Sequence, residues 1–259
     1  MTDIFRKHKV KTKFTTLELR QTNSLFELCI NDQVIHSNLD VNQPGKLLLK
    51  NLRYLMGAQL FISAPKRILL LGTGGGALIH FIQHHYPASH VTSVDIDGEL
   101  VEFLQSHMHL PPDSPKLTHV IEDAQTFLGR DQNQYDLILV DIFSGFQSPQ
   151  WLLTASQLKI IKDRLASGAA IAFNLLINSE HQFKNFYRDL RRTFNQKTLC
   201  LSVEGLENTL VFAMRDPVFG MQIPELQIKA EVLKQQQEIE FPEILSNMLT
   251  TNPIGCGII

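Results

Sequence analysis

The chain has 259 residues, with 24 Lys and Arg against 26 Asp and Glu, and 44% of its residues are hydrophobic. This length suits one large α/β domain with a small additional region, and the hydrophobic content excludes global disorder. A net charge of −2 gives no general attraction to nucleic acid or to an anionic membrane. The three cysteines are widely spaced, which excludes a CxxC site and fits a reducing compartment.

The N-terminal sequence has no apolar run, and no apolar stretch approaches the length needed to span a bilayer. We therefore expect a cytoplasmic protein with no membrane partner and no nucleic-acid partner. The basic stretch Arg6–Lys13 is short and is interpreted as a mobile terminus. The sequence leaves the oligomeric state open, a homodimer included.

The first predicted region, residues 1–43, is a small N-terminal β piece. Three short runs, Thr15–Arg20, Leu25–Ile30 and Gln33–Ser37, have the composition of strands, and Asn31-Asp32 suits a hairpin turn.

The second predicted region, residues 44–216, is a large α/β domain. Pro44 precedes an apolar period of 3.6 residues, which predicts a helix over Lys46–Leu60. Continuous apolar runs then alternate with amphipathic stretches, as expected for a parallel sheet with helices on both faces. The predicted strands are Ile68–Leu71, Val91–Val94, Leu117–Ile121, Tyr135–Val140 and Ala169–Asn174. The predicted helices are a segment ending near His85, Gly98–Ser106, Gln150–Ala166 and Ser179–Thr193.

The end of this domain indicates the fold class. Two further strands, Lys197–Val203 and Asn208–Met214, are separated only by Glu204–Glu207, which is too short for a crossover, so the pair must be antiparallel. A Rossmann-like α/β sheet with an antiparallel last strand is the arrangement of the class I methyltransferase fold. Residues 217–259 are predicted as a helical tail with one helix over Glu225–Glu238.

A glycine loop, Gly72–Ala77, lies directly between a predicted strand and a predicted helix. Glycines there allow a sharp turn and a close approach of the backbone to a ligand. The loop also satisfies the dinucleotide motif GxGxx[G/A], so alone it does not separate a sulfonium nucleoside from NAD, or either from a tight turn without a ligand. We predict Gly72, Gly74, Gly75 and Gly76 as cofactor-binding residues.

Acidic residues follow the next strands. Asp95 closes the second strand, 23 residues after Gly72, where a carboxylate can accept hydrogen bonds from both ribose hydroxyls. Asp97 is interpreted as the cap of the next helix. Asp123 and Ala124 follow the third strand and suit an adenine amine and its ring plane. Because ligands of open α/β sheets bind at the carboxyl ends of the strands, these residues predict a nucleoside site.

Asp141 closes the fourth strand, so its carboxylate also lies at the edge of the sheet where ligands bind. The structural alternative for Asp141 is a cap of the next loop. His80 and His84 have an i,i+4 spacing, but no carboxylate or cysteine completes a set, so no metal is expected.

Taken together, these residues resemble the spermidine synthase family, especially its spermidine-synthase-like bacterial branch. The resemblance extends from about Leu25 to Met214. The matching segments are His36–Asp40, Pro44–Tyr54 with Met56, the glycine loop, Val94–Asp97, Glu122–Ala124, Tyr135–Asp136 with Val140–Asp141, Phe173–Leu175, Glu207–Asn208 and Phe212–Ala213. The resemblance implies S-adenosylmethionine, usually in its decarboxylated form, as co-substrate and an amine as acceptor. It also implies that Tyr54 and Ser144 contact the acceptor and that Asp141 is the catalytic base. Alkyl transfer from a sulfonium mainly needs in-line positioning and control of the nucleophile's proton, because the leaving thioether is neutral.

Two positions differ from the family's motifs. The family's loop has the sequence GGGDGG, whose acid helps to hold the donor's amine, and Gly75 takes that position here. After the fourth strand the family has D-S-[ST]-D; Asp141 is the first acid, but Ser144 replaces the second. Fewer carboxylates weaken the case for a dicationic acceptor, and Phe143 and Phe146 make this region less polar. Gly75 in place of the family's loop acid also predicts weak discrimination between the decarboxylated and the full donor.

Three function classes stay open from the sequence. The first is a transferase that moves an aminopropyl or methyl group from an S-adenosyl-type sulfonium donor to a small-molecule amine. The second, suggested by Gly75 and Ser144, is a noncatalytic nucleoside-binding or interaction protein. The third and least favoured is an NAD-dependent dehydrogenase, because no separate catalytic domain follows the sheet.

Overall fold

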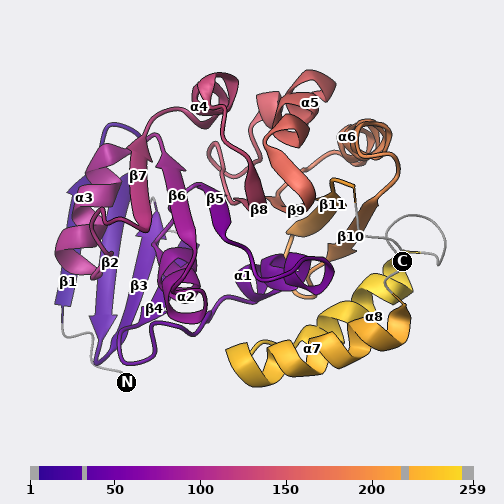
Figure 1. Cartoon of the computed structure of the whole chain (residues 1–259). Coiled ribbons are helices and arrows are strands. Elements are labelled where there is room, and N and C mark those ends of the chain that lie inside the picture. Colours follow the sequence, from indigo (N-terminus) through magenta and orange to yellow (C-terminus); the bar gives the residue numbers. More distant parts are fainter. Residues whose placement is uncertain (1–5, 31–33, 217–221, 253–259) are drawn as a thin grey trace.

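Two β-sheets and their covering helices make up the structure, a computed structural model that describes residues 6–30, 34–216 and 222–252 (Figure 1). The smaller sheet is antiparallel and consists, in spatial order, of β1 (Arg6–Lys11), β2 (Thr16–Thr22), β3 (Leu25–Ile30) and β4 (Val34–Asp40). The larger sheet consists, in spatial order, of β10 (Thr198–Ser202), β11 (Thr209–Met214), β9 (Leu165–Leu175), β8 (Tyr135–Val140), β5 (Arg67–Leu71), β6 (His90–Asp95) and β7 (Leu117–Ile121).

Strand directions in the larger sheet confirm the predicted fold class. Strands β5 to β9 run parallel to one another, whereas β11 lies antiparallel between β9 and β10. The carboxyl ends of β5, β6, β7, β8 and β9 therefore lie along one edge of the sheet, as expected for an open α/β sheet. The result is a Rossmann-like sheet with an antiparallel last strand and a small N-terminal β piece.

Apolar side chains point to both faces of the larger sheet, so helices cover both (Figure 1). Ile68 and Leu70 of β5 belong to one core cluster, and Leu69 and Leu71 belong to the other. The helices beside Leu69 and Leu71 are α4 (Ala124–Arg130), α5 (Ala155–Asp163) and α6 (Glu180–Thr193), with a 3₁₀ helix, η2 (Gln150–Leu153), before α5. The opposite face is covered by α1 (Lys50–Leu55), the 3₁₀ helix η1 (Met56–Phe61), α2 (Ala77–His85), α3 (Gly98–His107), α7 (Ile223–Gln237) and α8 (Phe241–Thr251).

The smaller sheet packs into the same cluster as α2 and α3 through Leu17, Leu19 and Leu28. Its first strand corrects the prediction for Arg6–Lys13: this stretch is not a mobile terminus, because its residues 6–11 pair with β2. The prediction failed because this edge strand has basic side chains at alternate positions and no apolar period. Within the sheet, buried Glu18 accepts from Lys7 and Arg20, and these bonds lower the pKa of Glu18 to about 2.

Several helix boundaries also differ from the predictions. The helix expected over Lys46–Leu60 begins only at Lys50 and becomes a 3₁₀ helix at Met56. A Cβ at Gly57 would lie 2.9 Å from Met248 Cε of α8, so glycine allows η1 to pack closely against α8. The helix expected over 150–166 is interrupted at Thr154, whose hydroxyl caps α5.

Two helices were not predicted, α4 and α8. α4 has only seven residues, too few to show a clear period. α8 begins near a proline in its first turn, in a part of the tail that was expected to be irregular. The expected turn at Asn31-Asp32 lies outside the described residues. Among the described residues, no helix has the length and apolar character needed to cross a membrane.

Candidate active site at the carboxyl edge of the sheet

The glycine loop lies between β5 and α2, at the carboxyl edge of the sheet. Gly72 has a φ of +93°, and a Cβ there would lie 2.3 Å from the backbone oxygen of Asp141, so only glycine fits. Gly74 and Gly76 also have left-handed φ values, and Gly76 is the N-cap of α2. Gly75 is different, because it lies against Ser37 of β4. The predicted loop is therefore tightly packed from two sides.

Asp95, at the end of β6, holds the loop through backbone amides. Its Oδ2 accepts a hydrogen bond from Thr73 N at 2.8 Å, and its Oδ1 accepts from Asp97 N at 3.0 Å. The Thr73 hydroxyl lies 2.9 Å from the hydroxyl of Ser93. These bonds fix the Asp95 carboxylate beside the glycine loop. Its contact with ribose hydroxyls stays a prediction.

Asp97 caps α3, as predicted. Its Oδ1 accepts from Leu100 N at 3.1 Å, and its Oδ2 accepts from the Thr12 hydroxyl at 2.6 Å. Lys13 N also donates to Glu99 Oε2 at 2.7 Å. The turn between β1 and β2 is therefore attached to the start of α3, next to Asp95.

Asp123 and Ala124 begin α4 after β7. Asp123 Oδ1 accepts from both the amide, at 2.9 Å, and the hydroxyl, at 3.1 Å, of Thr126, so Asp123 is a helix cap as well as a candidate adenine contact. Ala124 is buried in the core cluster below. Two apolar residues that the sequence reasoning did not consider, Ile96 and Ile121, are 47% and 52% exposed at the ends of β6 and β7. Ile96 directly follows β6 and Ile121 ends β7. An isoleucine at such a strand end, beside the acids, is the sequence signal that could have marked these residues as candidates for contact with a base.

Asp141, at the end of β8, lies beside the end of β5. Its backbone N donates to Leu71 O at 2.8 Å. Asn174 Nδ2 of β9 donates to Asp141 Oδ1 at 2.8 Å, and Asn208 Nδ2 donates to Asn174 Oδ1 at 2.8 Å. Asn174 is only 1% exposed, so its amide is fixed by these two bonds. The side-chain orientation of Asp141 therefore depends on two residues to which the sequence reasoning gave no role.

Ser144 lies in the exposed turn after Asp141. Its backbone N donates to Gln147 O at 2.8 Å, and Gly145 between them has a φ of +64°. Phe146 in this turn is 60% exposed. Ser144 is thus near the carboxyl edge, and its contact with an acceptor stays a prediction.

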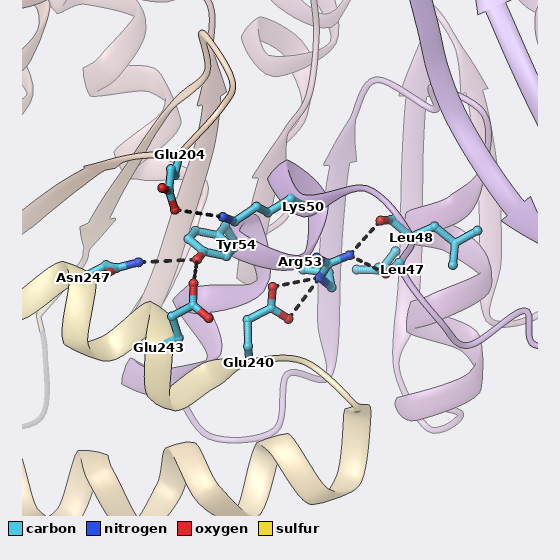
Figure 2. Close-up of polar contacts among 9 residues, drawn as sticks. All are labelled: Leu47, Leu48, Lys50, Arg53, Tyr54, Glu204, Glu240, Glu243 and Asn247. Carbon is cyan, nitrogen blue, oxygen red and sulfur yellow. Dashed lines mark hydrogen bonds and ion pairs between the residues drawn. The ribbon is translucent and has the colours of Figure 1, made fainter.

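Tyr54 of α1 is fully buried, and its hydroxyl points toward α8 (Figure 2). The hydroxyl donates to Glu243 Oε1 and accepts a bond of 3.4 Å from Asn247 Nδ2. Burial, together with the carboxylate of Glu243, raises the pKa of Tyr54. Lys50 Nζ lies 5.4 Å from the ring centroid of Tyr54 and 3.8 Å from Glu204 Oε2 in the loop after β10.

A second contact joins α1 to the start of α8 (Figure 2). Arg53 Nε lies 3.0 Å from both carboxylate oxygens of Glu240, and its Nη1 donates to Leu48 O at 2.7 Å. Contacts with α8 therefore fix α1. The sequence could not predict the partners of Tyr54, because α8 itself was not predicted. Its predicted contact with an acceptor is untested. Among the described residues, no group of three or more His, Cys, Asp or Glu is arranged to hold a metal ion.

Comparison with known proteins supports the resemblance inferred from the sequence. The spermine/spermidine synthase domain matches residues 53–203. A polyamine aminopropyltransferase of Neisseria meningitidis is 24% identical over 96% of this chain and 94% of the relative. One of Chromobacterium violaceum is 25% identical over 93% and 92%. A mouse eEF1A lysine and N-terminal methyltransferase is 24% identical over 80% of this chain and 31% of its own length.

Solved structures show the same fold. A probable spermidine synthase from Corynebacterium glutamicum has a TM-score of 0.77 at 20% identity, covering 89% of this chain and 86% of that chain. Human methyltransferase-like protein 13, in complex with SAH, has a TM-score of 0.63 at 24% identity, covering 73% and 89%. At these identities the structural likeness concerns the fold, whereas the family model matches more than half of the chain. The chain therefore belongs to the spermine/spermidine synthase family of alkyltransferases.

Proposed function

We propose that the chain binds an S-adenosyl-type sulfonium nucleoside over Gly72–Gly76 and transfers an alkyl group from it to a small-molecule amine. Aminopropyl transfer from decarboxylated S-adenosylmethionine is the leading reaction, in agreement with the named relatives. In this proposal residues 44–216 hold the nucleoside, and residues 1–43 and 217–259 are flanking regions.

The observation that supports this proposal best is the proximity of the glycine loop to Asp141. β5 and β8 are neighbours, and Asp141 N donates to Leu71 O at 2.8 Å, directly before Gly72. A nucleoside that rests on the loop and on Asp95 would therefore extend its sulfonium toward Asp141. This is the position in which a carboxylate can receive a proton from an attacking amine.

The reaction needs few groups. The amine nitrogen attacks the carbon next to the sulfonium, a new N–C bond forms, and the C–S bond breaks as sulfur takes the electron pair to become a neutral thioether. The amine must lose a proton before or during the attack, and Asp141 accepts it or passes it to water. Asn174 and Asn208 would hold the Asp141 carboxylate at a fixed angle, which contributes by orientation rather than by contact with the substrate.

Methyl transfer from full S-adenosylmethionine is the second candidate. The absence of an acid at Gly75 and the similarity to a mouse methyltransferase favour it. The two reactions use the same donor site, and they differ in the carbon that is attacked and in the nucleoside that is released.

The test is an assay of the purified protein with each donor and with putrescine, cadaverine, agmatine or spermidine as acceptor. Aminopropyl transfer releases methylthioadenosine, and methyl transfer releases S-adenosylhomocysteine. Calorimetry with methylthioadenosine and NAD measures nucleoside binding separately. Binding of methylthioadenosine without turnover of any pair would favour the noncatalytic class, and binding of NAD alone would favour a dehydrogenase.

A further inference from the structure

Position 75 of the glycine loop is restricted by a neighbour and not by its own backbone conformation. Gly75 has no positive φ, unlike Gly72, Gly74 and Gly76. A Cβ at Gly75 would lie 2.2 Å from Ser37 Cβ and 2.4 Å from Ser37 Oγ. Contacts of this length do not occur between real side chains, so any residue other than glycine requires Ser37 to move.

Ser37 has little freedom to move. It belongs to β4, where it pairs with Leu28 of β3, and it is only 2% exposed. Its Oγ has no hydrogen-bond partner among the described residues. Since a buried hydroxyl without a partner adds no stabilising bond, the main effect of this side chain is to fill the space beside Gly75.

The same part of the loop contains no acid. Residues 72–76 are glycines and one threonine, and the first turn of α2 has no acidic residue. Gly76 is the N-cap of α2 and has no side chain to accept from the first amides of the helix. A helix N-terminus with free amides favours negative charge over positive charge. A decarboxylated donor has only an ammonium group in its tail, whereas the full donor has an ammonium and a carboxylate. A loop without a carboxylate can neither attract the first tail strongly nor repel the second.

We propose that Ser37 is a specificity-determining residue of the donor site. By occupying the space beside Gly75, this residue of the N-terminal sheet keeps the loop free of a side chain. The site therefore selects its donor by the nucleoside and discriminates little between tails with and without a carboxylate. This inference rests on the proposed function, because it assumes that a sulfonium nucleoside binds over the loop.

Removing the Ser37 side chain while adding one at position 75 tests the proposal. The double variant Ser37→Gly/Gly75→Asp makes room for a carboxylate, and Ser37→Gly/Gly75→Ala is the uncharged control. Calorimetry measures the affinities of each variant for methylthioadenosine, S-adenosylmethionine and decarboxylated S-adenosylmethionine. We expect the two donors to differ by less than about tenfold in the wild type, which corresponds to about 1.4 kcal/mol. The Asp variant should shift this ratio at least about tenfold toward the decarboxylated donor, and the Ala control should not.

A stability measurement tests the steric part separately. Gly75→Asp alone should lower the thermal unfolding temperature, and adding Ser37→Gly should restore part of the loss. The proposal is overturned if Gly75→Asp alone is as stable as the wild type. It is also overturned if the ratio of the affinities for the two donors does not shift in Ser37→Gly/Gly75→Asp, or if the wild type already binds the decarboxylated donor about a hundredfold more tightly. A wild type that binds no methylthioadenosine would instead contradict the proposed function, and this inference with it.

Discussion

The two halves of the carboxyl edge are built differently. In the half formed by β5, β6 and β7, carboxylates bind backbone amides: Asp95 accepts from Thr73 and Asp97, and Asp123 accepts from Thr126. In the half formed by β8, β9 and β11, the Asp141 carboxylate is held by the side chain of Asn174, which is held in turn by Asn208. The proposed donor half is thus fixed mainly by the backbone, and the proposed acceptor half by side chains.

The two halves should therefore respond differently to amino-acid substitutions. Backbone amides are present whatever the side chains of Thr73, Asp97 and Thr126 are, so the amide hydrogen bonds of the donor half do not depend on the identity of these donor residues. The acceptor half depends on the identity of each amide side chain, and a change at any of them alters the orientation of Asp141. We therefore expect substitutions in the acceptor half to change turnover and those in the donor half to change binding.

Asp141→Asn should give the largest effect. General base catalysis typically contributes about 10²–10⁴-fold, so turnover should fall by a factor in that range. Binding of methylthioadenosine should stay nearly unchanged, because the nucleoside is expected to rest on Asp95 and the loop. Steady-state kinetics and calorimetry on the same preparation measure both quantities. Full activity in this variant would remove Asp141 from the mechanism.

Asp95→Ala should give the opposite pattern. Loss of the carboxylate leaves ligand hydroxyls without partners, which should weaken binding of methylthioadenosine or S-adenosylmethionine by about 1–3 kcal/mol. Two backbone amides, of Thr73 and Asp97, also lose their acceptor, so the loop should become less stable. Asp95→Asn is the matched control, because it keeps the size and one acceptor oxygen. Unchanged nucleoside affinity in the Ala variant would place Asp95 outside the site.

Asn174→Ala sharpens the comparison further. It leaves Asp141 without its amide donor and Asn208 without its acceptor, at a buried position, so the protein should lose about 1–3 kcal/mol of unfolding free energy. Turnover should fall by about tenfold, less than in Asp141→Asn, because the base is still present but less well oriented. Nucleoside affinity should not change.

Asn208→Ala is the control for this network, since it removes only the outer bond. Its effect on turnover should be smaller than that of Asn174→Ala, while the affinity for methylthioadenosine should stay the same in both. If both variants lose stability but keep the wild-type turnover, the two asparagines support the fold without positioning Asp141.

The places of the glycine loop, Asp95 and Asp97 at the carboxyl edge could be predicted from the sequence because they follow from sheet order, whereas the ligand contacts of these residues stay predictions. The glycine loop, Asp95 and the Asp97 cap lie within 26 residues of one another, and each is recognised from its place at a strand end. In the acceptor half, Asn174 lies 33 residues from Asp141, and Asn208 lies 34 residues from Asn174. Asn174 lies between apolar strand residues and Asn208 lies directly before a strand, and sequence alone does not tell an amide that holds a carboxylate from one that faces solvent.

Contacts of the flanking regions were the hardest to predict. Ser37 of β4 meets Gly75 only because the small sheet packs beside α2, and no local pattern indicates this packing. Tyr54 and Glu243 are 189 residues apart, and Glu243 belongs to a helix that composition did not indicate. Where two elements meet only through the tertiary packing of a flanking region, sequence periodicity identifies the elements at best, not their contact.

Tyr54→Phe should give the smallest effect, and it decides to which region Tyr54 belongs. The variant removes one hydrogen bond to Glu243 while the ring stays packed under Lys50, and Glu243 is exposed enough to be rehydrated. The loss of unfolding free energy should therefore be about 1 kcal/mol in urea titrations. Because the hydroxyl is bonded to Glu243 and Asn247 of α8, KM for the amine acceptor should stay the same. Glu243→Gln is the matched control, since it keeps an acceptor for the hydroxyl and should cost less. A raised acceptor KM in Tyr54→Phe with unchanged stability would instead assign the hydroxyl to the acceptor half, as the family resemblance implies.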